Sequence, residues 1–435
     1  MKSQSNLSLN WTNNTKVKPK ILFPNSLDGL KKILSTKNFI CTGNQRSYGD
    51  VAVNPNFLVS MQNFNKVIKF DKKKGIIEVE GGVILSDILK LIIEHGWFFP
   101  VTPGTKYVSI GGMIANNVHG KKTSKNQIKY YIKEFKILLE NKKILRCSLS
   151  SNKKIFDLTI GGFGLTGIIL SAKIKLKKIS SPIINQNIIA YNSYKEFFSH
   201  LKKSKKYDYY VSWVQSFNEI YFNGLSYFGS HSNNKDNLKI YFKDKKISFL
   251  NYLLLKIFTQ NYYGIKILNF FHKSFKLVFY PKKTDILNYF YPQDKFTNWN
   301  KIYGNKGFIQ IQFLVKKNKF KEVMGEIGNY LKENKQFSPF VVIKNYDERG
   351  KYLNFIGKGI SISMDMRIDN KFSNLKFFFN KLFLKYGARI NLSKDFIASH
   401  KYISRENDYK IFKKEINKLN KRGKFNSVFS KRLGI

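Results

Sequence analysis

Residues 43–50 read GNQRSYGD, a polar stretch with a glycine at its start and another near its end. Two more glycine-bearing turns follow, PGT at residues 103–105 and SIGG at residues 109–112. Because glycine has no side chain, such turns let backbone N–H groups approach phosphate oxygens closely. Ordinary turns of a β-rich domain also use glycine. Three turns in this order, followed at once by HGK at residues 119–121, favour a phosphate-bearing ligand over ordinary turns.

A fourth glycine cluster, GFGLTG at residues 162–167, matches the G-x-G-x-x-G pattern of dinucleotide-binding folds. In those folds the pattern opens a helix whose N-terminus holds a pyrophosphate. Here residues 168–176 alternate apolar and basic side chains and predict a β-strand. A Rossmann-type NAD site is therefore not expected. A P-loop is excluded too, since Ala115 stands where its first glycine should be and Lys122 where its hydroxyl should be.

The composition is that of a large globular protein. Of its 435 residues, 43% are hydrophobic and 16% aromatic, which provides apolar material for two or three domains. Disordered, collagen-like and small disulfide-bonded classes are excluded. The glycine clusters end near residue 180, where Lys, Phe, Tyr and Asn begin to dominate, so we expect a domain boundary there. The sequence has no internal repeat of the length found in solenoids and propellers, so these folds are excluded.

The formal net charge is +49, and only eight of the 77 basic residues are arginines, which leaves 69 lysines. Nucleic-acid readers usually concentrate arginine, whose planar fork grips phosphate and guanine, so no nucleic-acid partner is expected. The codon composition of an AT-rich genome would produce the same excess of lysine. Attraction to an anionic membrane surface or to a phosphorylated substrate is the functional alternative.

Cysteine usage and hydropathy indicate where the protein works. Cys41 and Cys147 form no C-x-x-C motif, which favours a reduced compartment, and residues 1–10 lack the apolar core of a signal peptide. Residues 249–280 are aromatic and apolar but are broken by four lysines, short of the ~18 uninterrupted apolar residues of a spanning helix. This segment could lie on a membrane surface. We therefore expect a cytoplasmic protein, with peripheral contact at the inner membrane as an option.

The first 100 residues show periodic patterns that predict helices and strands. The patterns predict helices at residues 24–34, beginning at Asn25 or Ser26, and at residues 86–96, ending at Gly96, and strands at residues 57–61, 66–70 and 75–80.

The glycine turns, together with GGMIANNVHGK at residues 111–121 and GGFGLTGI at residues 161–168, resemble the FAD domain of the vanillyl-alcohol-oxidase, or PCMH-type, flavoproteins. Within that family the chain is most similar to the decaprenylphosphoryl-ribose-oxidase-like proteins. Further matching stretches are residues 290–294 (FYPQD), 299–300 (WN), 307–313 (GFIQIQF), 393–395 (SKD) and 429–434 (FSKRLG). The resemblance thus extends over nearly the whole chain.

The resemblance implies an α+β fold. Residues 1–180 would form a PCMH-type FAD-binding domain of two subdomains with the cofactor between them. Residues 181–394 would form an α+β substrate domain whose antiparallel sheet covers the flavin, and residues 395–435 would return to the FAD domain.

FAD is the cofactor that the resemblance implies, and no metal site is expected. Many relatives attach FAD covalently through a histidine in the first glycine turn, but Arg46 stands there, so we expect noncovalent FAD. The residues that the resemblance assigns to the cofactor are Gly43, Asn44, Gln45, Arg46, Ser47, Tyr48, Gly49, Pro103, Gly104, Thr105, Ser109, Gly111, Gly112, Ala115, Asn116, Val118, His119, Gly164, Gly167 and Ile168.

Oxidation of an alcohol needs a group that takes the hydroxyl proton while a hydride leaves for the flavin. Matching positions make Lys394, His119 and Lys121 the candidates. Lys394 is favoured, because a lysine in a low-dielectric pocket can have its pKa lowered into the working range. The departure of Asn391 from the tyrosine usual in the family affects the expected flavin contacts and substrate fit.

Further residues match the family's substrate pocket. They are Gln310, Gln312, Lys344, Ser363 and Trp213. Gln310 and Gln312 alternate with apolar residues and so share one face of a predicted strand. That face could bind sugar hydroxyls or could be an exposed polar surface.

The implied function is FAD-dependent oxidation of a secondary sugar hydroxyl to a ketone. The expected substrate is the 2′-hydroxyl of a polyprenyl-phosphate-linked pentose in cell-envelope polysaccharide synthesis. A separate NAD(P)H-dependent reductase would then complete an epimerisation. The alternatives are an aldonolactone oxidase of the D-arabinono-1,4-lactone type, acting on a soluble sugar, and a basic protein without enzymatic activity that binds membranes or nucleic acid.

Overall fold

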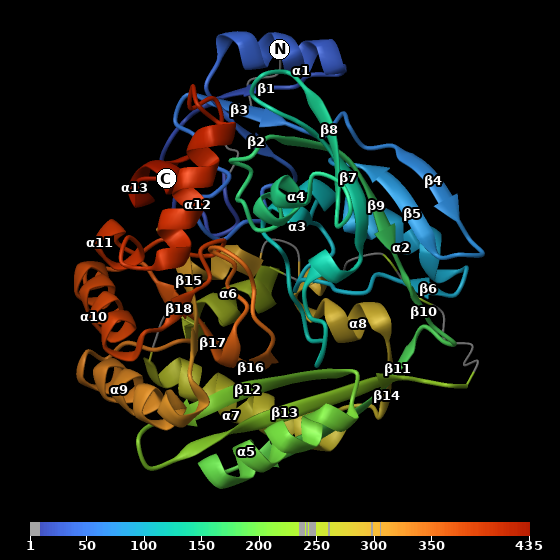
Figure 1. Ribbon diagram of the computed structural model, residues 1–435. Helices are drawn as coiled ribbons and strands as arrows, with labels where there is room; N and C mark the ends of the chain where they lie inside the picture. The colour runs from blue at the N-terminus through green and yellow to red at the C-terminus, as the bar shows by residue number, and fades with distance from the viewer. Residues whose placement is uncertain are drawn as a thin grey trace.

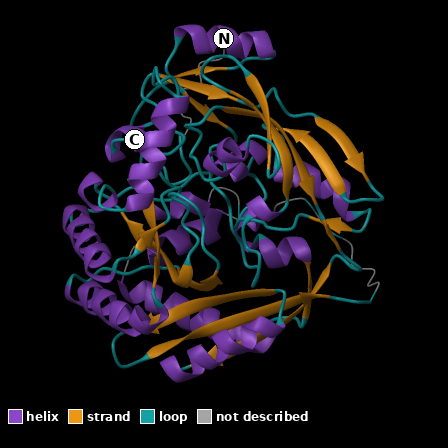
Figure 2. Ribbon diagram, viewed as in Figure 1, coloured by secondary structure: helices purple, strands orange, loops and turns teal. Residues whose placement is uncertain are grey.

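The computed structural model describes residues 9–234, 240, 242, 249–259, 262–296, 299–304 and 306–435. It shows an α+β protein in which a large antiparallel sheet lies opposite two smaller sheets (Figure 1). Helices cover much of the outside of these sheets (Figure 2). The expected fold class is therefore confirmed.

The first small sheet is parallel and presents the first glycine turn. β3 (Phe57–Ser60) lies between β1 (Lys20–Leu22) and β2 (Ile40–Thr42). α1 (Leu27–Thr36) begins after Ser26, whose Oγ accepts a hydrogen bond from the Gly29 N–H at 3.1 Å, as the sequence predicts. Because β2 ends at Thr42, the turn that starts at Gly43 leaves directly from the end of this sheet.

The second small sheet has five antiparallel strands and carries the later glycine turns. In spatial order they are β4 (Val67–Asp71), β5 (Ile76–Glu80), β9 (Ile168–Lys175), β7 (Ile132–Leu138) and β8 (Ile144–Ser148). The helices of this region are α2 (Leu85–Ile93), α3 (Ile110–Ala115) and α4 (Lys153–Thr159). β9 begins directly after Gly167, so the cluster at residues 162–167 leads into a strand and not into a dinucleotide-binding helix, as expected.

The large sheet has eight strands that all pair antiparallel. In spatial order they are β14 (Lys283–Asp285), β11 (Ile183–Tyr191), β13 (Phe222–His231), β12 (Tyr209–Phe217), β16 (Val341–Asp347), β17 (Lys358–Arg367), β15 (Phe308–Val315) and β18 (Arg389–Ile390). In β15, Ile309 and Ile311 belong to the main apolar core, while Gln310 and Gln312 line a cavity on the other face. Both glutamines are buried, which excludes an exposed polar face.

Helices lie on both faces of the large sheet. The core face packs on α5 (Tyr194–Lys203), α9 (Phe320–Glu333) and α10 (Phe372–Tyr386). The other helices of this part of the chain are α6 (Phe249–Thr259), α7 (Tyr262–Phe279) and α8 (Ile286–Phe290). α7 reaches the cavity face, because the ring of His272 lies edge-on to Trp213 of β12, with 4.7 Å between ring centroids.

The end of the chain returns to the first small sheet. It forms α11 (His400–Ile403), α12 (Asn407–Leu419) and α13 (Val428–Leu433). Elsewhere in the chain, β6 (Trp97–Phe98) and β10 (Lys177–Lys178) form a short antiparallel pair. Phe39 donates its backbone N–H to the Lys424 carbonyl at 2.8 Å and pairs with Phe425. The domain boundaries at residues 180 and 394 stay predictions. No helix in the described part of the chain combines the length and the apolar character needed to cross a lipid bilayer.

Candidate active site

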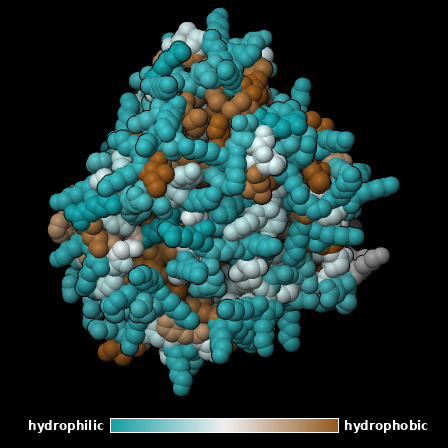
Figure 3. Space-filling model, in the orientation of Figure 1, coloured by the Kyte–Doolittle hydropathy of each residue, from teal (hydrophilic) through white to brown (hydrophobic). Residues whose placement is uncertain are grey.

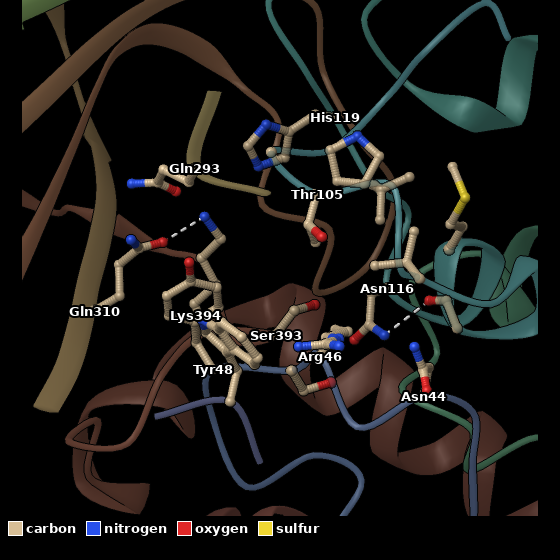
Figure 4. A pocket seen from close by; sticks show the side chains of 18 of the residues that line it. Asn44, Arg46, Tyr48, Thr105, Asn116, His119, Gln293, Gln310, Ser393 and Lys394 are labelled. Carbon is tan, nitrogen blue, oxygen red and sulfur yellow. Dashed lines mark hydrogen bonds between the residues drawn. The ribbon is translucent and has the colours of Figure 1, made fainter. Parts of the chain in front are cut away.

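One cavity of about 800 Å³ lies between the glycine turns and the large sheet. Figure 4 shows side chains from both parts of the chain pointing into it, among them Arg46 and Asn116 from one part and Gln310 from the other. Its volume falls within the range of cofactor and substrate pockets. All site residues expected from the sequence line this cavity except Gly49.

The first glycine turn packs tightly against the start of α3. A Cβ added to Gly43 would lie 1.9 Å from the Ser109 Oγ, which caps α3 by accepting a hydrogen bond from the Gly112 N–H. By contrast, a Cβ on Gly104 would meet no atom within 4 Å. The turns therefore approach each other at Gly43 and leave open space at Gly104.

The polar groups of the glycine turns and of α3 fit FAD. Asn116 uses its amide N–H to donate to the Gly112 carbonyl at 2.8 Å, while its buried Oδ1 has no partner among the described residues. Asn44 donates to the Tyr107 carbonyl at 2.8 Å, which fixes the first turn to the second. A buried acceptor without a partner beside a glycine-walled cavity suits a ligand that brings its own donors, as the ring and ribityl groups of FAD do.

Arg46 is held by aromatic rings at the cavity wall. Its guanidinium lies 4.3 Å from the Trp11 ring centroid and 5.4 Å from that of Tyr107. Asp294, from the FYPQD stretch, accepts a hydrogen bond from the Lys106 backbone N–H at 2.7 Å. This contact joins the turn at residues 103–105 to the segment that precedes β15.

Lys394 lines the cavity and is held by a chain of hydrogen bonds. Its Nζ donates to the Gln310 Oε1 at 2.5 Å, the contact drawn as a dashed line in Figure 4. Gln310 in turn donates its amide N–H to Asp365 at 2.7 Å, and the Tyr303 hydroxyl donates to the same carboxylate at 2.9 Å. Asp365 thereby sets the orientation of the Gln310 amide, so that its oxygen faces Lys394.

Burial lowers the pKa of every lysine in this cavity that the sequence singled out. It lowers the pKa of Lys121 to about 7. It lowers the pKa of Lys344 to about 7 as well, helped by the charges of Lys394 and Lys121. The pKa of Lys394 falls to about 8, with the charge of Asp365 opposing the fall, and burial raises the pKa of Asp365 to about 6. Near neutral pH these amines can therefore exchange protons with a substrate.

His119 is a neutral side chain with both ring nitrogens occupied. Burial holds its pKa well below the usual value, and the charges of Lys344 and Lys394 add to this effect. Nδ1 lies 2.7 Å from the Tyr346 hydroxyl, and Nε2 accepts from the Asn391 amide at 3.3 Å. Asn391 also donates to the Gln312 Oε1 at 2.8 Å. These contacts favour Lys394 over His119 as the group that takes a proton.

The amine of Lys121 is engaged by Tyr289, which also lines the cavity. Its ammonium lies 4.7 Å from the Tyr289 ring centroid and donates to the carbonyl of the same residue. The side-chain amine of Lys344, by contrast, makes no hydrogen bond or ion pair with the residues that the structure describes. Its amine is the one of the three best placed to meet an anionic group in the cavity.

A buried ion cluster of Arg432, Asp50 and Asp395 holds the loop that carries Lys394. Arg432 of α13 donates to both oxygens of Asp50 at 3.0 Å and to the Asp395 carboxylate at 3.0 Å. Asp50 follows the first glycine turn, and Asp395 follows Lys394. A Cβ on Gly49 would lie 2.3 Å from the Asp395 carbonyl oxygen, so Gly49 allows this close approach although it does not line the cavity.

Asp365 is not among the residues expected from the sequence, although its strand carries a signal. β17 contains Ser361, Ser363 and Asp365 at alternate positions, and the pairing with β15 sets Gln310 opposite Asp365 and Gln312 opposite Ser363. The Gln312 amide donates to the Ser361 Oγ at 3.1 Å. The alternation was the available signal, since every second residue of a strand shares one face.

The pH dependence of flavin reduction tests the role of Asp365. We expect the wild-type rate to rise as the pH passes the pKa of Lys394 near 8, because the neutral amine is the base. Asp365→Asn removes the negative charge that raises this pKa, so the rise should move to lower pH. Anaerobic single-turnover reduction between pH 6 and 10 measures the shift.

The exposed Asp87→Asn serves as the matched control and should keep the wild-type profile. An unchanged profile in Asp365→Asn, with FAD still bound, would contradict the coupling between Asp365 and Lys394.

Residues 21–148 match the sequence model of the family described as an FAD binding domain. The decaprenylphosphoryl-beta-D-ribose oxidase of Mycolicibacterium smegmatis is 26% identical over 82% of this chain and 81% of that protein. The L-gulonolactone oxidase of Bos taurus is 26% identical over 45% of this chain and 46% of its own length. The putative D-arabinono-1,4-lactone oxidase of Neurospora crassa is 27% identical over 35% of this chain and 28% of its own length. FAD as the cofactor and the oxidoreductase class are thereby confirmed.

Proposed function

We propose that this FAD-dependent oxidoreductase oxidises a secondary hydroxyl of a sugar, the 2′-hydroxyl of a polyprenyl-phosphate-linked pentose, to a ketone. The observation that carries the proposal is the lysine set of the cavity, in which Lys394 is bound to Gln310 while the amine of Lys344 has no partner among the described residues. An anionic phosphate beside the sugar would match that amine. The similarity to the mycobacterial oxidase over 82% of the chain supports the same substrate class.

The residues of the cavity divide the reaction between them. Neutral Lys394 takes the hydroxyl proton onto Nζ, and Gln310 holds that amine in place. When bound, FAD would supply the acceptor for the hydride that leaves the carbinol carbon. Gln312 and Ser363 offer polar groups to the remaining hydroxyls, while Trp213 provides an apolar wall.

A soluble aldonolactone is the second candidate substrate. The matches to L-gulonolactone oxidase and to a putative D-arabinono-1,4-lactone oxidase favour it. A neutral lactone makes no use of the cation of Lys344, so the two substrates predict different effects of removing it.

Anaerobic bleaching of the flavin absorbance separates these functions. Purified holoprotein is mixed with polyprenyl-phosphoryl pentoses and, separately, with gulono- and arabinonolactones. We expect the phosphorylated sugars to bleach the flavin and to give a product two hydrogens lighter. In Lys344→Ala, the substrate concentration that gives half of the maximal bleaching rate should be higher. Bleaching by lactones alone, unaffected by Lys344→Ala, would establish the second candidate instead.

A reductase partner and a location follow from the proposed reaction. A ketone at the 2′-position becomes an epimer when a hydride is returned to its opposite face, so we propose a separate NAD(P)H-dependent reductase. A polyprenyl carrier remains in its bilayer, which places the reaction at the cytoplasmic side of the inner membrane in this proposal.

FAD should be bound without a covalent bond. Arg46 occupies the position of the linking histidine and is held between Trp11 and Tyr107. Acid precipitation of the purified protein should leave all flavin fluorescence in the supernatant. Flavin that stays with the washed pellet would contradict this prediction.

A further inference from the structure

α6 and α7 form a pair of helices with an unusual outer surface. On its inner side α7 buries Ile265, and Asn269 donates to the Gln215 carbonyl of β12 at 3.3 Å. His272, one turn further, reaches Trp213. These positions follow helical spacing and fix which side of α7 faces the sheet.

The outer side of this pair is apolar as well. Exposed there are Tyr263, Ile267, Phe270, Phe271, Val278 and Phe279. We call these six residues the α6–α7 apolar surface. Phe271 is 64% exposed and Val278 71%. A contiguous exposed apolar patch on a protein surface normally marks an interaction site, so this surface calls for an apolar partner. The face of the molecule seen in Figure 3 is, by contrast, mostly hydrophilic with scattered apolar spots.

The charges around this surface have one sign. Residues 249–280 contain Lys256, Lys266, Lys273 and Lys276 and no Asp or Glu. A second copy of the chain would bring lysines against lysines and would be repelled. An anionic lipid headgroup layer meets the lysines with opposite charge and accepts the aromatic side chains between its headgroups.

The same helix borders the active-site cavity. His272, Phe275, Lys276 and Tyr280 line that cavity, and Phe275 is also exposed. The outer surface and the cavity mouth are therefore continuous along α7.

We propose that the α6–α7 apolar surface docks the protein on an anionic lipid bilayer, with the cavity mouth at the headgroup layer. Docking stands on the exposed residues and their charge. Delivery of a lipid-linked sugar to the cavity rests, in addition, on the proposed function.

Vesicle sedimentation tests the docking. The holoprotein is mixed with vesicles of phosphatidylcholine alone and of phosphatidylcholine with phosphatidylglycerol, at low and at high salt. We expect pelleting with the anionic vesicles at low salt and much weaker pelleting at 1 M salt, where the Debye length falls to about 3 Å. The triple variant Phe270→Ser/Phe271→Ser/Val278→Ser should lower the partition at least about 100-fold, since each side chain loses its apolar burial in the bilayer.

The matched control removes three exposed apolar side chains elsewhere, Phe377→Ser/Leu384→Ser/Ile411→Ser on α10 and α12, and should pellet like the wild type. Retained FAD shows that each variant is folded. Wild-type protein that fails to pellet with anionic vesicles, or a triple variant that pellets equally well, would overturn the proposal and point to a protein partner or to codon composition. Equal pelleting with uncharged vesicles would overturn its anionic part. None of these results depends on which sugar bleaches the flavin, so failure of the proposed function is recognised separately.

Discussion

Lys394→Ala should keep its FAD and reduce that flavin with substrate about 10²–10⁴-fold more slowly than the wild type. Lys394 is the cavity amine that Gln310 holds at 2.5 Å, and its lowered pKa of about 8 supplies a neutral amine at working pH. Anaerobic stopped-flow absorbance of the flavin measures this step without any second electron acceptor. Flavin content after gel filtration shows that the variant remains folded.

Lys394→Arg distinguishes proton transfer from simple charge. Arginine keeps the positive charge but does not lose its proton in proteins, so this variant should be as slow as Lys394→Ala. The exposed Lys401→Ala is the control and should reduce its flavin at the wild-type rate. A normal rate in Lys394→Ala would assign the proton to another cavity group, and Lys121 and Lys344, whose pKa values burial also lowers, are the candidates.

Arg432→Met should destabilise the protein by about 3–5 kcal/mol, because it leaves two buried carboxylates without their cation. The side chains of Asp50 and Asp395 are only 1% and 2% exposed, and Arg432 contacts both at 3.0 Å. Urea unfolding of the holoprotein measures the loss. Since the cluster joins the first glycine turn to the Lys394 loop, the variant should also release FAD more readily.

The loss in Arg432→Met should depend on pH with a definite sign. Burial raises the pKa of Asp50 even when Arg432 is present, and removal of Arg432 raises it further. A carboxyl with a raised folded-state pKa destabilises the fold above that pKa, so the deficit should shrink as the pH falls through it. Asp50→Asn should restore part of the stability in the double variant.

The exposed Arg405→Met provides the baseline, with a change within about 0.5 kcal/mol. Equal stability of Arg432→Met and the wild type at pH 8 would show that the cluster does not hold the loop.

The local features of the chain were predictable because they depend on neighbours in sequence. Ser26 starts α1 because its side chain caps the first turn, and Gly167 precedes a strand because residues 168–175 alternate in polarity. The apolar period of residues 86–96 likewise predicted a helix, which the structure has at Leu85–Ile93, while the α+β class and the position of the cofactor site came from the resemblance of the glycine motifs to a known family.

The composition of the catalytic site depended on contacts between distant strands and loops. Nothing in sequence distinguishes Lys394 from 68 other lysines except its motif, whereas its partner Gln310 is 84 residues away. Asp365 faces Gln310 only because β15 and β17 pair in one register, since a shift by one residue would turn both side chains to the opposite face. The sequence by itself determined several local helices, strands and turns, and the resemblance of its motifs to a known family indicated the cofactor. The tertiary structure decided that Lys394 meets the Gln310 amide, which Asp365 orients, and that the apolar side of α7 stays exposed. Strand register and burial are set by packing between distant parts of the chain, so neighbouring residues in the sequence do not reveal them.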